Sequence, residues 1–171
     1  MEETVMNTYY IKQKLFSWKD RFRVKDADGE DVFLVEGELI SIGKKLHMYD
    51  ADGREIFLIE QKLITFLPVY EIRAGGKLIA KVSKKISLFS PEYYVEGPGW
   101  TVEGSISAHN YKITGAAGAV AVIRKAWFSW GDSYEISVEK DINARLAVAV
   151  VIVIDAVLAT GNDAAAMPMS Y

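Results

Sequence analysis

The sequence predicts a mainly β protein of repeated hairpins, with one long apolar helix near the C-terminus that the sheet must cover. Three observations lead to this fold class: a duplicated strand-turn-strand unit, further glycine turns at similar spacing, and an apolar run too long for a strand. The chain has 171 residues, close to the usual size of one domain. We therefore expect a single domain over residues 1–171.

The duplicated unit becomes visible when residues 21–40 are aligned with residues 45–64. Both segments contain Asp-Ala-Asp-Gly followed by Phe-Leu, and both end in Leu-Ile. Asp-Gly between β-rich runs is a strong hairpin signal, because glycine adopts a positive φ without steric cost. Gly29 and Gly53 are therefore predicted to be turn residues. The alternative, a calcium loop, needs a frame of about 12 residues with a closing Glu, and the strand-like residues 32–34 begin too early for it.

Three further turns divide the chain downstream, at Gly75-Gly76, Gly97-Pro98-Gly99 and Gly115-Ala116-Ala117-Gly118. The flanking segments carry apolar side chains mostly at every second position, the period of a half-buried strand. The last turn also resembles a glycine-rich nucleotide loop, but that loop requires a βαβ unit, and the segments around it predict antiparallel strands. About a dozen strands precede residue 140, and so many must curl, pack or close. A barrel or a sandwich is predicted.

Residues 142–160 are predicted to form the helix, with Asp141 as its N-cap and Gly161 just past its C-terminus. The segment is rich in β-branched residues, but it is too long for an ordinary strand. Apolar side chains surround the whole helix, so it must be wrapped by protein or inserted in a bilayer. The uncharged stretch between Arg145 and Asp155 is far shorter than the roughly 20 residues of a membrane span. Wrapping by protein is therefore expected, without a transmembrane segment.

Asp155 lies within the apolar circumference of this helix, so its carboxylate needs a hydrogen bond, an ion pair or a place near an open end. Arg145 is not its partner, because ten residues along a helix separate the two by about 15 Å.

Several stretches of the sequence resemble a known family. They are the end of the apolar helix, Val151-Ile152-Val153-Ile154-Asp155-Ala156-Val157, the run from Ile59 to Leu63 continuing to Pro68-Val69-Tyr70-Glu71-Ile72, and the opening YYIKQKLFSW from Tyr9. Together they resemble the LURP-one-related family, whose fold is similar to the tubby C-terminal domain. The resemblance spans about residues 8–160. It implies a closed antiparallel barrel of about twelve strands around a central hydrophobic helix.

The resemblance also implies a class of function. Tubby domains bind phosphoinositide head groups through basic residues, and the related scramblases act at membranes, often with lipidated cysteines. This chain has no cysteine, and no motif carries a lipid-binding residue of those relatives onto a numbered position here. The implied role is that of a ligand-binding or tethering module.

Composition and motifs narrow the function further. A formal net charge of −3 argues against a nucleic-acid partner, and the absence of cysteine and of a secretory signal predicts a cytoplasmic protein. No catalytic motif occurs, so neither an enzyme nor a cofactor is predicted. The histidines, His47 and His109, stand apart in the sequence; we expect them to be solvated or capped, and we predict no metal site. A catalytic group assembled from distant residues is the least favoured alternative.

Three basic doublets are the candidate ligand-binding residues: Lys44, Lys45, Lys84, Lys85, Arg124 and Lys125. Lys19, Arg21 and Arg23 add alternating positive charges near the start. If the fold brought some of these together, they would bind anionic lipid head groups or phosphates. Interspersed acidic residues favour the simpler interpretation of ordinary solvated charge.

We therefore expect a non-enzymatic cytoplasmic binding or tethering module for anionic phospholipid head groups or a membrane-associated partner. The alternative is a structural or regulatory protein-protein interaction domain. Its handle would be the tail after Gly161 or the segment Trp127-Phe128-Ser129-Trp130, placed in the connection before the last strand. Exposed, that segment would be a partner-binding tip; buried, it would plug the end of the barrel.

Overall fold

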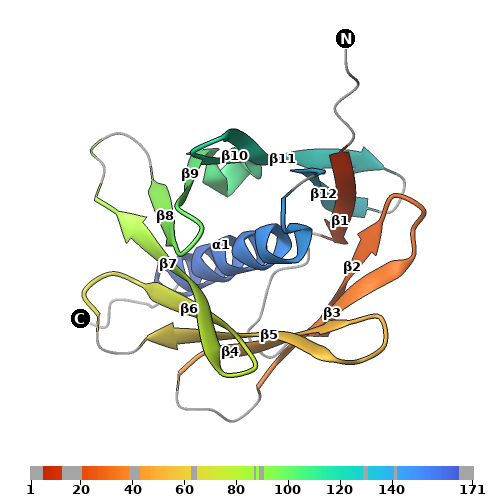
Figure 1. Cartoon of the computed structure of the whole chain (residues 1–171). Coiled ribbons are helices and arrows are strands. Elements are labelled where there is room, and N and C mark those ends of the chain that lie inside the picture. Colours follow the sequence, from red (N-terminus) through yellow and green to blue (C-terminus); the bar gives the residue numbers. More distant parts are fainter. Residues whose placement is uncertain are drawn as a thin grey trace.

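Twelve antiparallel strands form a closed barrel around one helix in the computed structural model of the chain (Figure 1). The structure describes residues 6–12, 21–38, 43–62, 65–86, 88, 91–128, 131–140 and 142–165. The strands, in chain order, are β1 (Met6–Lys12), β2 (Arg21–Asp26), β3 (Asp31–Gly37), β4 (Lys45–Asp50), β5 (Glu55–Lys62), β6 (Val69–Ala74), β7 (Lys77–Lys85), β8 (Glu92–Glu96), β9 (Trp100–Ser105), β10 (Asn110–Gly115), β11 (Gly118–Phe128) and β12 (Gly131–Glu139). The helix α1 spans Ala144–Ala165, and a short 3-10 helix, η1, spans Ile106–Ala108.

Each strand pairs with its neighbours in the sequence, and β1 closes the barrel by pairing with both β2 and β12. Among the described strands, each therefore has a partner on both sides, so the barrel solves the edge problem that a sheet of this size poses. The predicted closed barrel of about twelve strands is confirmed.

The antiparallel order sorts the connections onto the two ends of the barrel. The β2–β3, β4–β5, β6–β7, β8–β9 and β10–β11 turns share one end with the start of α1; we call it the turn end. The connections β1–β2, β3–β4, β5–β6, β7–β8, β9–β10 and β11–β12 share the opposite end, the loop end. All five predicted glycine turns therefore lie at the same end of the molecule.

The sequence repeat corresponds to two turns of the same geometry. Asp26 Oδ1 accepts hydrogen bonds from the backbone N–H groups of Asp28 and Glu30, both at 2.9 Å. In the second copy Asp50 Oδ1 accepts from Asp52 and Arg54, at 3.0 and 2.9 Å. The glycines of the two turns, Gly29 and Gly53, have φ values of 83° and 78°, as predicted for hairpin turns. The first Asp of each unit is thus engaged by its own turn.

The helix fills the barrel. Every side chain from Ala147 to Ile154 is fully buried, and eight consecutive residues cover more than two turns, so every face of α1 is packed along this stretch. The inward-facing strand residues around it are mainly valine and isoleucine, with several tyrosines. The predicted wrapping of an apolar helix by the sheet is confirmed. Within the described residues, no helix is long and apolar enough to cross a membrane.

The helix ends differ from the prediction. Helix α1 begins at Ala144, and the side chain of Asn143 caps it by accepting a hydrogen bond from the Leu146 N–H at 3.2 Å. Asp141, the predicted N-cap, lies outside the described residues. The prediction that the helix stops before Gly161 is wrong, because α1 continues to Ala165. A single glycine costs a helix only about 1 kcal/mol, and the alanines that follow have the highest helix propensity.

The prediction for the tryptophan-containing segment also needs correction. Trp127 and Phe128 belong to the end of β11 by their backbone and pair with Asp132 and Gly131 of β12. They are not in a connection. Ser129 and Trp130 lie outside the described residues, as does the end of the tail, residues 166–171.

Candidate functional site

A binding site is expected on the outer face or at the two ends of the barrel, because α1 occupies the space that larger barrels use for ligands. Two of the three basic doublets lie at the loop end. Lys45 opens β4, directly after Lys44, and Lys84 and Lys85 close β7. Strands β4 and β7 are separated by β5 and β6, which places the two doublets about 14 Å apart along the sheet.

The third doublet lies elsewhere. Arg124 and Lys125 are exposed residues of β11, which is separated from β7 by three intervening strands. Across the strand pair, Arg124 faces Glu135 of β12. The fold thus brings together two of the sequence-predicted doublets and holds the third on another side of the barrel.

Acidic neighbours differ between the two doublets at the loop end. Lys45 Nζ lies 3.3 Å from Glu60 Oε1, so a carboxylate offsets its charge. Lys85 Nζ is 4.0 Å from Glu92 Oε2 and 5.7 Å from the centre of the Tyr94 ring. Lys84 is exposed, and no ion pair joins it to another described residue. The Lys84-Lys85 doublet therefore presents the less compensated positive charge.

Two basic residues near the start of the chain, Arg21 and Arg23, form ion pairs with carboxylates of the neighbouring strand. Arg21 forms an ion pair with Glu36, and Arg23 Nη1 lies 2.8 Å from Asp31 Oδ2. These are contacts between β2 and β3, and exposed pairs of this kind contribute little to stability. Lys19 lies outside the described residues.

Sequence reasoning missed the apolar residues of the same end. Phe66 in the β5–β6 connection is 99% exposed, and Ile86 and Leu88 in the β7–β8 connection are 88% and 91% exposed. The sequence does contain a signal: after Lys62 the chain reads LITFLP, and after Lys85 it reads ISLFSP. In both places a strand that ends in lysine is followed by a largely apolar segment and a proline.

The partner of Asp155 is His109, which sequence reasoning expected to be solvated or capped. His109 Nε2 lies 3.2 Å from Asp155 Oδ1, and both side chains are only 12% exposed. The contact has ion-pair distance but not hydrogen-bond geometry, since Asp155 Oδ1 has no hydrogen-bond partner among the described residues. The His109 ring also stacks on Tyr134, with ring centres 4.8 Å apart. This cluster lies inside the loop end, where the β9–β10 connection meets α1.

Backbone conformation sets His109 apart as well. It has a φ of 50°, the only positive value among the described non-glycine residues, and its N–H closes η1 by donating to the Ile106 carbonyl at 3.1 Å. A positive φ is uncommon in non-glycine residues, although histidine adopts it more readily than most of them. Two phenol oxygens nearby, those of Tyr111 and Tyr134, are buried without a hydrogen-bond partner among the described residues.

His47 lies on the outer face and is held between two carboxylates. Its Nε2 is 2.7 Å from Glu38 Oε1, and its Nδ1 is 2.6 Å from Glu55 Oε2. Partial burial lowers the pKa of His47, but the hydrogen bonds to Glu38 and Glu55 together outweigh burial and raise the pKa above its usual value. Both ring nitrogens are engaged, so the imidazole is not available as a metal ligand in this arrangement.

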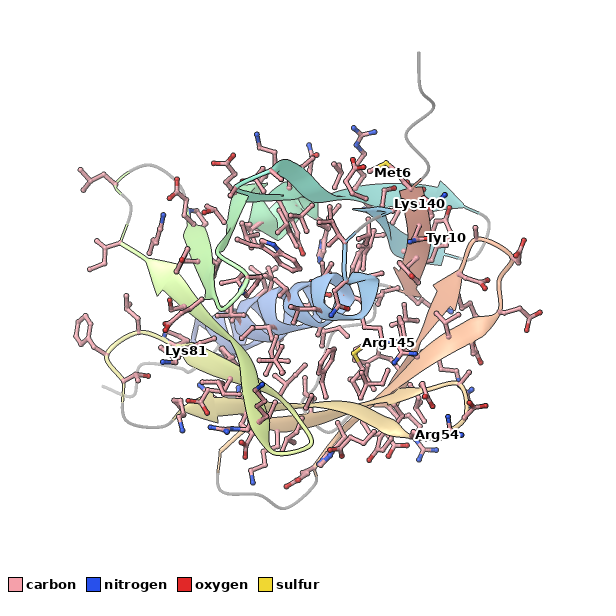
Figure 2. The ribbon with its side chains drawn as sticks, in the orientation of Figure 1. Met6, Tyr10, Arg54, Lys81, Lys140 and Arg145 are labelled. Atoms are coloured by element: carbon pink, nitrogen blue, oxygen red, sulfur yellow. The ribbon has the colours of Figure 1, made fainter. Side chains whose placement is uncertain are left out.

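A depression of about 560 Å³ lies at the turn end. Its walls include Tyr9, Phe33, Asp50, Asp52 and Arg145. Figure 2 shows Arg145 beside the first turn of α1, on the side of β3. One arginine and two aspartates share this wall, so the depression presents both positive and negative charge to a ligand. Within the described residues, no group of three or more histidine, aspartate or glutamate side chains is placed to bind a metal ion.

Comparisons with known proteins agree with this architecture. Residues 7–155 match the LURP-one-related family. The uncharacterized protein YxjI of Bacillus subtilis (strain 168) is 36% identical over 154 residues, which cover 90% of this chain and 95% of that protein. An X-ray structure of the Arabidopsis thaliana protein AT5G01750 superimposes with a TM-score of 0.68 at 14% identity, covering 90% and 92% of the two chains. The structural similarity shows the fold, whereas the family match and the sequence identity to YxjI show common descent. The chain belongs to the LURP-one-related family.

Proposed function

We propose that this protein is a non-enzymatic binding or tethering module that docks on anionic surfaces through the loop end of its barrel. The observation that carries the proposal is the placement of Lys84 and Lys85 at the end of β7, with Lys44 and Lys45 on the same rim at β4, beyond the two intervening strands β5 and β6. Four lysines on one sector provide positive charge to a chain whose net charge is −3. Lysines near an anionic surface each contribute about 1 kcal/mol to binding.

Two features of the fold support binding over catalysis. Within the described residues, the interior of the barrel is filled by α1, which leaves no space for a substrate inside it. Each of the two histidines is engaged by a carboxylate at close range. The phosphate-bearing head groups of anionic lipids, or a membrane-associated partner of similar charge, suit a rim of lysines that act as point charges.

Vesicle sedimentation tests this proposal. Wild-type protein is expected to bind phosphatidylcholine vesicles that contain phosphatidylserine more strongly than vesicles of phosphatidylcholine alone, and salt is expected to weaken this binding. Reversing both charges in the variant Lys84→Glu with Lys85→Glu should lower the affinity at least about tenfold, since two charges of about 1 kcal/mol each are lost.

The matched control is Arg124→Glu with Lys125→Glu, an equal charge reversal on β11 and away from the proposed rim. It should retain most of the binding if position matters and not only net charge. Equal losses in both variants would mean that net charge alone acts. Wild-type binding that is absent, or unaffected by salt, would instead favour the alternative of a protein-protein interaction domain.

A further inference from the structure

Three side chains at the loop end are exposed to a degree that is rare for apolar residues. Phe66, Ile86 and Leu88 are 99%, 88% and 91% exposed, whereas the next large apolar side chains among the described residues, Leu78 and Tyr94, reach only 41% and 38%. A single exposed apolar residue needs no explanation, but several gathered at one end of a molecule mark an interaction site.

The three residues belong to two connections that project from the same end of the barrel. Phe66 follows β5, and Ile86 and Leu88 follow β7; only the β6–β7 hairpin separates the two connections. Strands β5 and β7 both run toward the left side of the view in Figure 1, where the C-terminal end of α1 also lies. The two apolar tips therefore follow strands that end on the same side of the barrel.

Positive charge lies at the base of these tips. Lys84 and Lys85 immediately precede Ile86, and Lys62 ends the strand that leads to Phe66. Lys62 is half exposed and 3.3 Å from Glu71 Oε2, so Lys84 and Lys85 are the less compensated charges. Apolar tips beyond a belt of lysines match the layers of a bilayer surface, with acyl chains beneath anionic head groups.

We infer that Phe66, Ile86 and Leu88 insert into the acyl-chain boundary of a membrane while Lys84 and Lys85 stay at the level of the head groups. This inference rests on the proposed function and makes its partner a lipid bilayer, as opposed to a soluble phosphate or a protein. A specific protein partner needs a continuous, complementary surface of about 800 Å² on each side. Separate side chains on two tips do not form such a surface, whereas a bilayer accepts them without shape complementarity.

The absence of cysteine from this chain allows a clean test. Single variants Phe66→Cys and Leu88→Cys, labelled with the environment-sensitive fluorophore NBD, should show a blue shift and higher emission on vesicles that contain phosphatidylserine. Leu78→Cys, on the β7 residue next to the turn end, is the matched control and should show neither change. Labels at Phe66 and Leu88 that keep their aqueous emission on vesicle-bound protein would overturn the inference.

A second variant, Phe66→Ser with Ile86→Ser and Leu88→Ser, separates insertion from electrostatic docking. Its thermal melting should match that of the wild type, because exposed side chains contribute little to the core. Binding to anionic vesicles at high salt should fall by about tenfold or more, since charge attraction is screened there and apolar insertion is not. Unchanged binding of this variant at high salt would also overturn the inference.

The two proposals can fail separately. Salt-sensitive wild-type binding without emission changes at the labelled tips would leave electrostatic docking in place and remove insertion. Failure of the wild type to bind any vesicle, with or without phosphatidylserine, would remove both.

Discussion

His109 Nε2 lies 3.2 Å from Asp155 Oδ1, so the β9–β10 connection contacts the central helix through two titratable side chains. Burial raises the pKa of the Asp155 carboxyl above its usual range, and the neighbouring His109 ring lowers it only in part. Burial, together with the nearby Asp155 carboxylate, raises the pKa of Tyr111 well above its usual value. A charge inside the loop end thus costs free energy that His109 partly offsets.

Asp155→Asn should therefore change the pH dependence of stability. A carboxyl whose pKa is raised in the folded state stabilises that state most below the unfolded pKa of about 3.9, and the contribution is lost as pH rises through the folded pKa. As pH rises from the unfolded to the folded pKa of Asp155, the variant should gain free energy of unfolding relative to the wild type. The gain should be about 1.4 kcal/mol for each unit by which the folded pKa is raised, and the difference should stay constant at higher pH. Urea unfolding at a series of pH values measures the difference.

The variant His109→Gln provides the control for that experiment. It removes the imidazole that lowers the pKa of Asp155, so the pKa of Asp155 should rise further and the protein should lose stability near neutral pH. If Asp155→Asn and the wild type kept a constant stability difference from acid to neutral pH, the carboxyl would not be titrating as described.

His47→Gln should have the opposite dependence on pH. The pKa of His47 is raised in the folded protein, so its stabilising contribution is complete below the unfolded pKa of about 6.5 and is lost as pH rises through the folded pKa. The substitution should cost stability in mild acid and much less at alkaline pH. Thermal melting at several pH values checks this, and an NMR titration of the His47 ring should give a midpoint above 6.5. A midpoint at or below that value contradicts the prediction.

Gly97→Ala should destabilise the barrel more than Gly53→Ala does. Both residues have a positive φ, 106° and 78°, which is strained for alanine and costs roughly 1–2 kcal/mol. A Cβ at Gly97 would also lie 2.4 Å from the Ile79 carbonyl oxygen, whereas a Cβ at Gly53 meets no atom within 4 Å. We expect a loss of about 1 kcal/mol for Gly53→Ala and about 3 kcal/mol or more for Gly97→Ala, measured by urea unfolding. Equal losses would mean that conformational strain alone matters.

Deletion of residues 142–160 should abolish soluble expression. The segment supplies Leu146 and the fully buried residues 147–154 that fill the barrel. Burial of its large aliphatic side chains contributes roughly 15–25 kcal/mol as an upper estimate, more than the net stability of a typical domain. Expression and melting of the truncated chain test this directly; a soluble product with cooperative unfolding would contradict the barrel architecture.

The local elements of this fold are predictable from the residues themselves. Gly29 and Gly53 predict turns because a positive φ at an Asp-Gly step depends on neighbours within a few residues. The central helix predicts its own burial because its apolar side chains leave no polar face. The prediction that the helix ends before Gly161 is wrong because a glycine favours the end of a helix but does not by itself terminate one.

The sequence by itself therefore determined the hairpins, the helix and the need to cover that helix. Only the tertiary structure decided that His109 faces Asp155, that Lys44 and Lys84 share a rim while Arg124 does not, and that two apolar tips project beside them. The physical reason is that these contacts form only when the sheet closes into a barrel. Which distant residues meet depends on the order and direction of all twelve strands around the barrel, and no local pattern of residues contains that information.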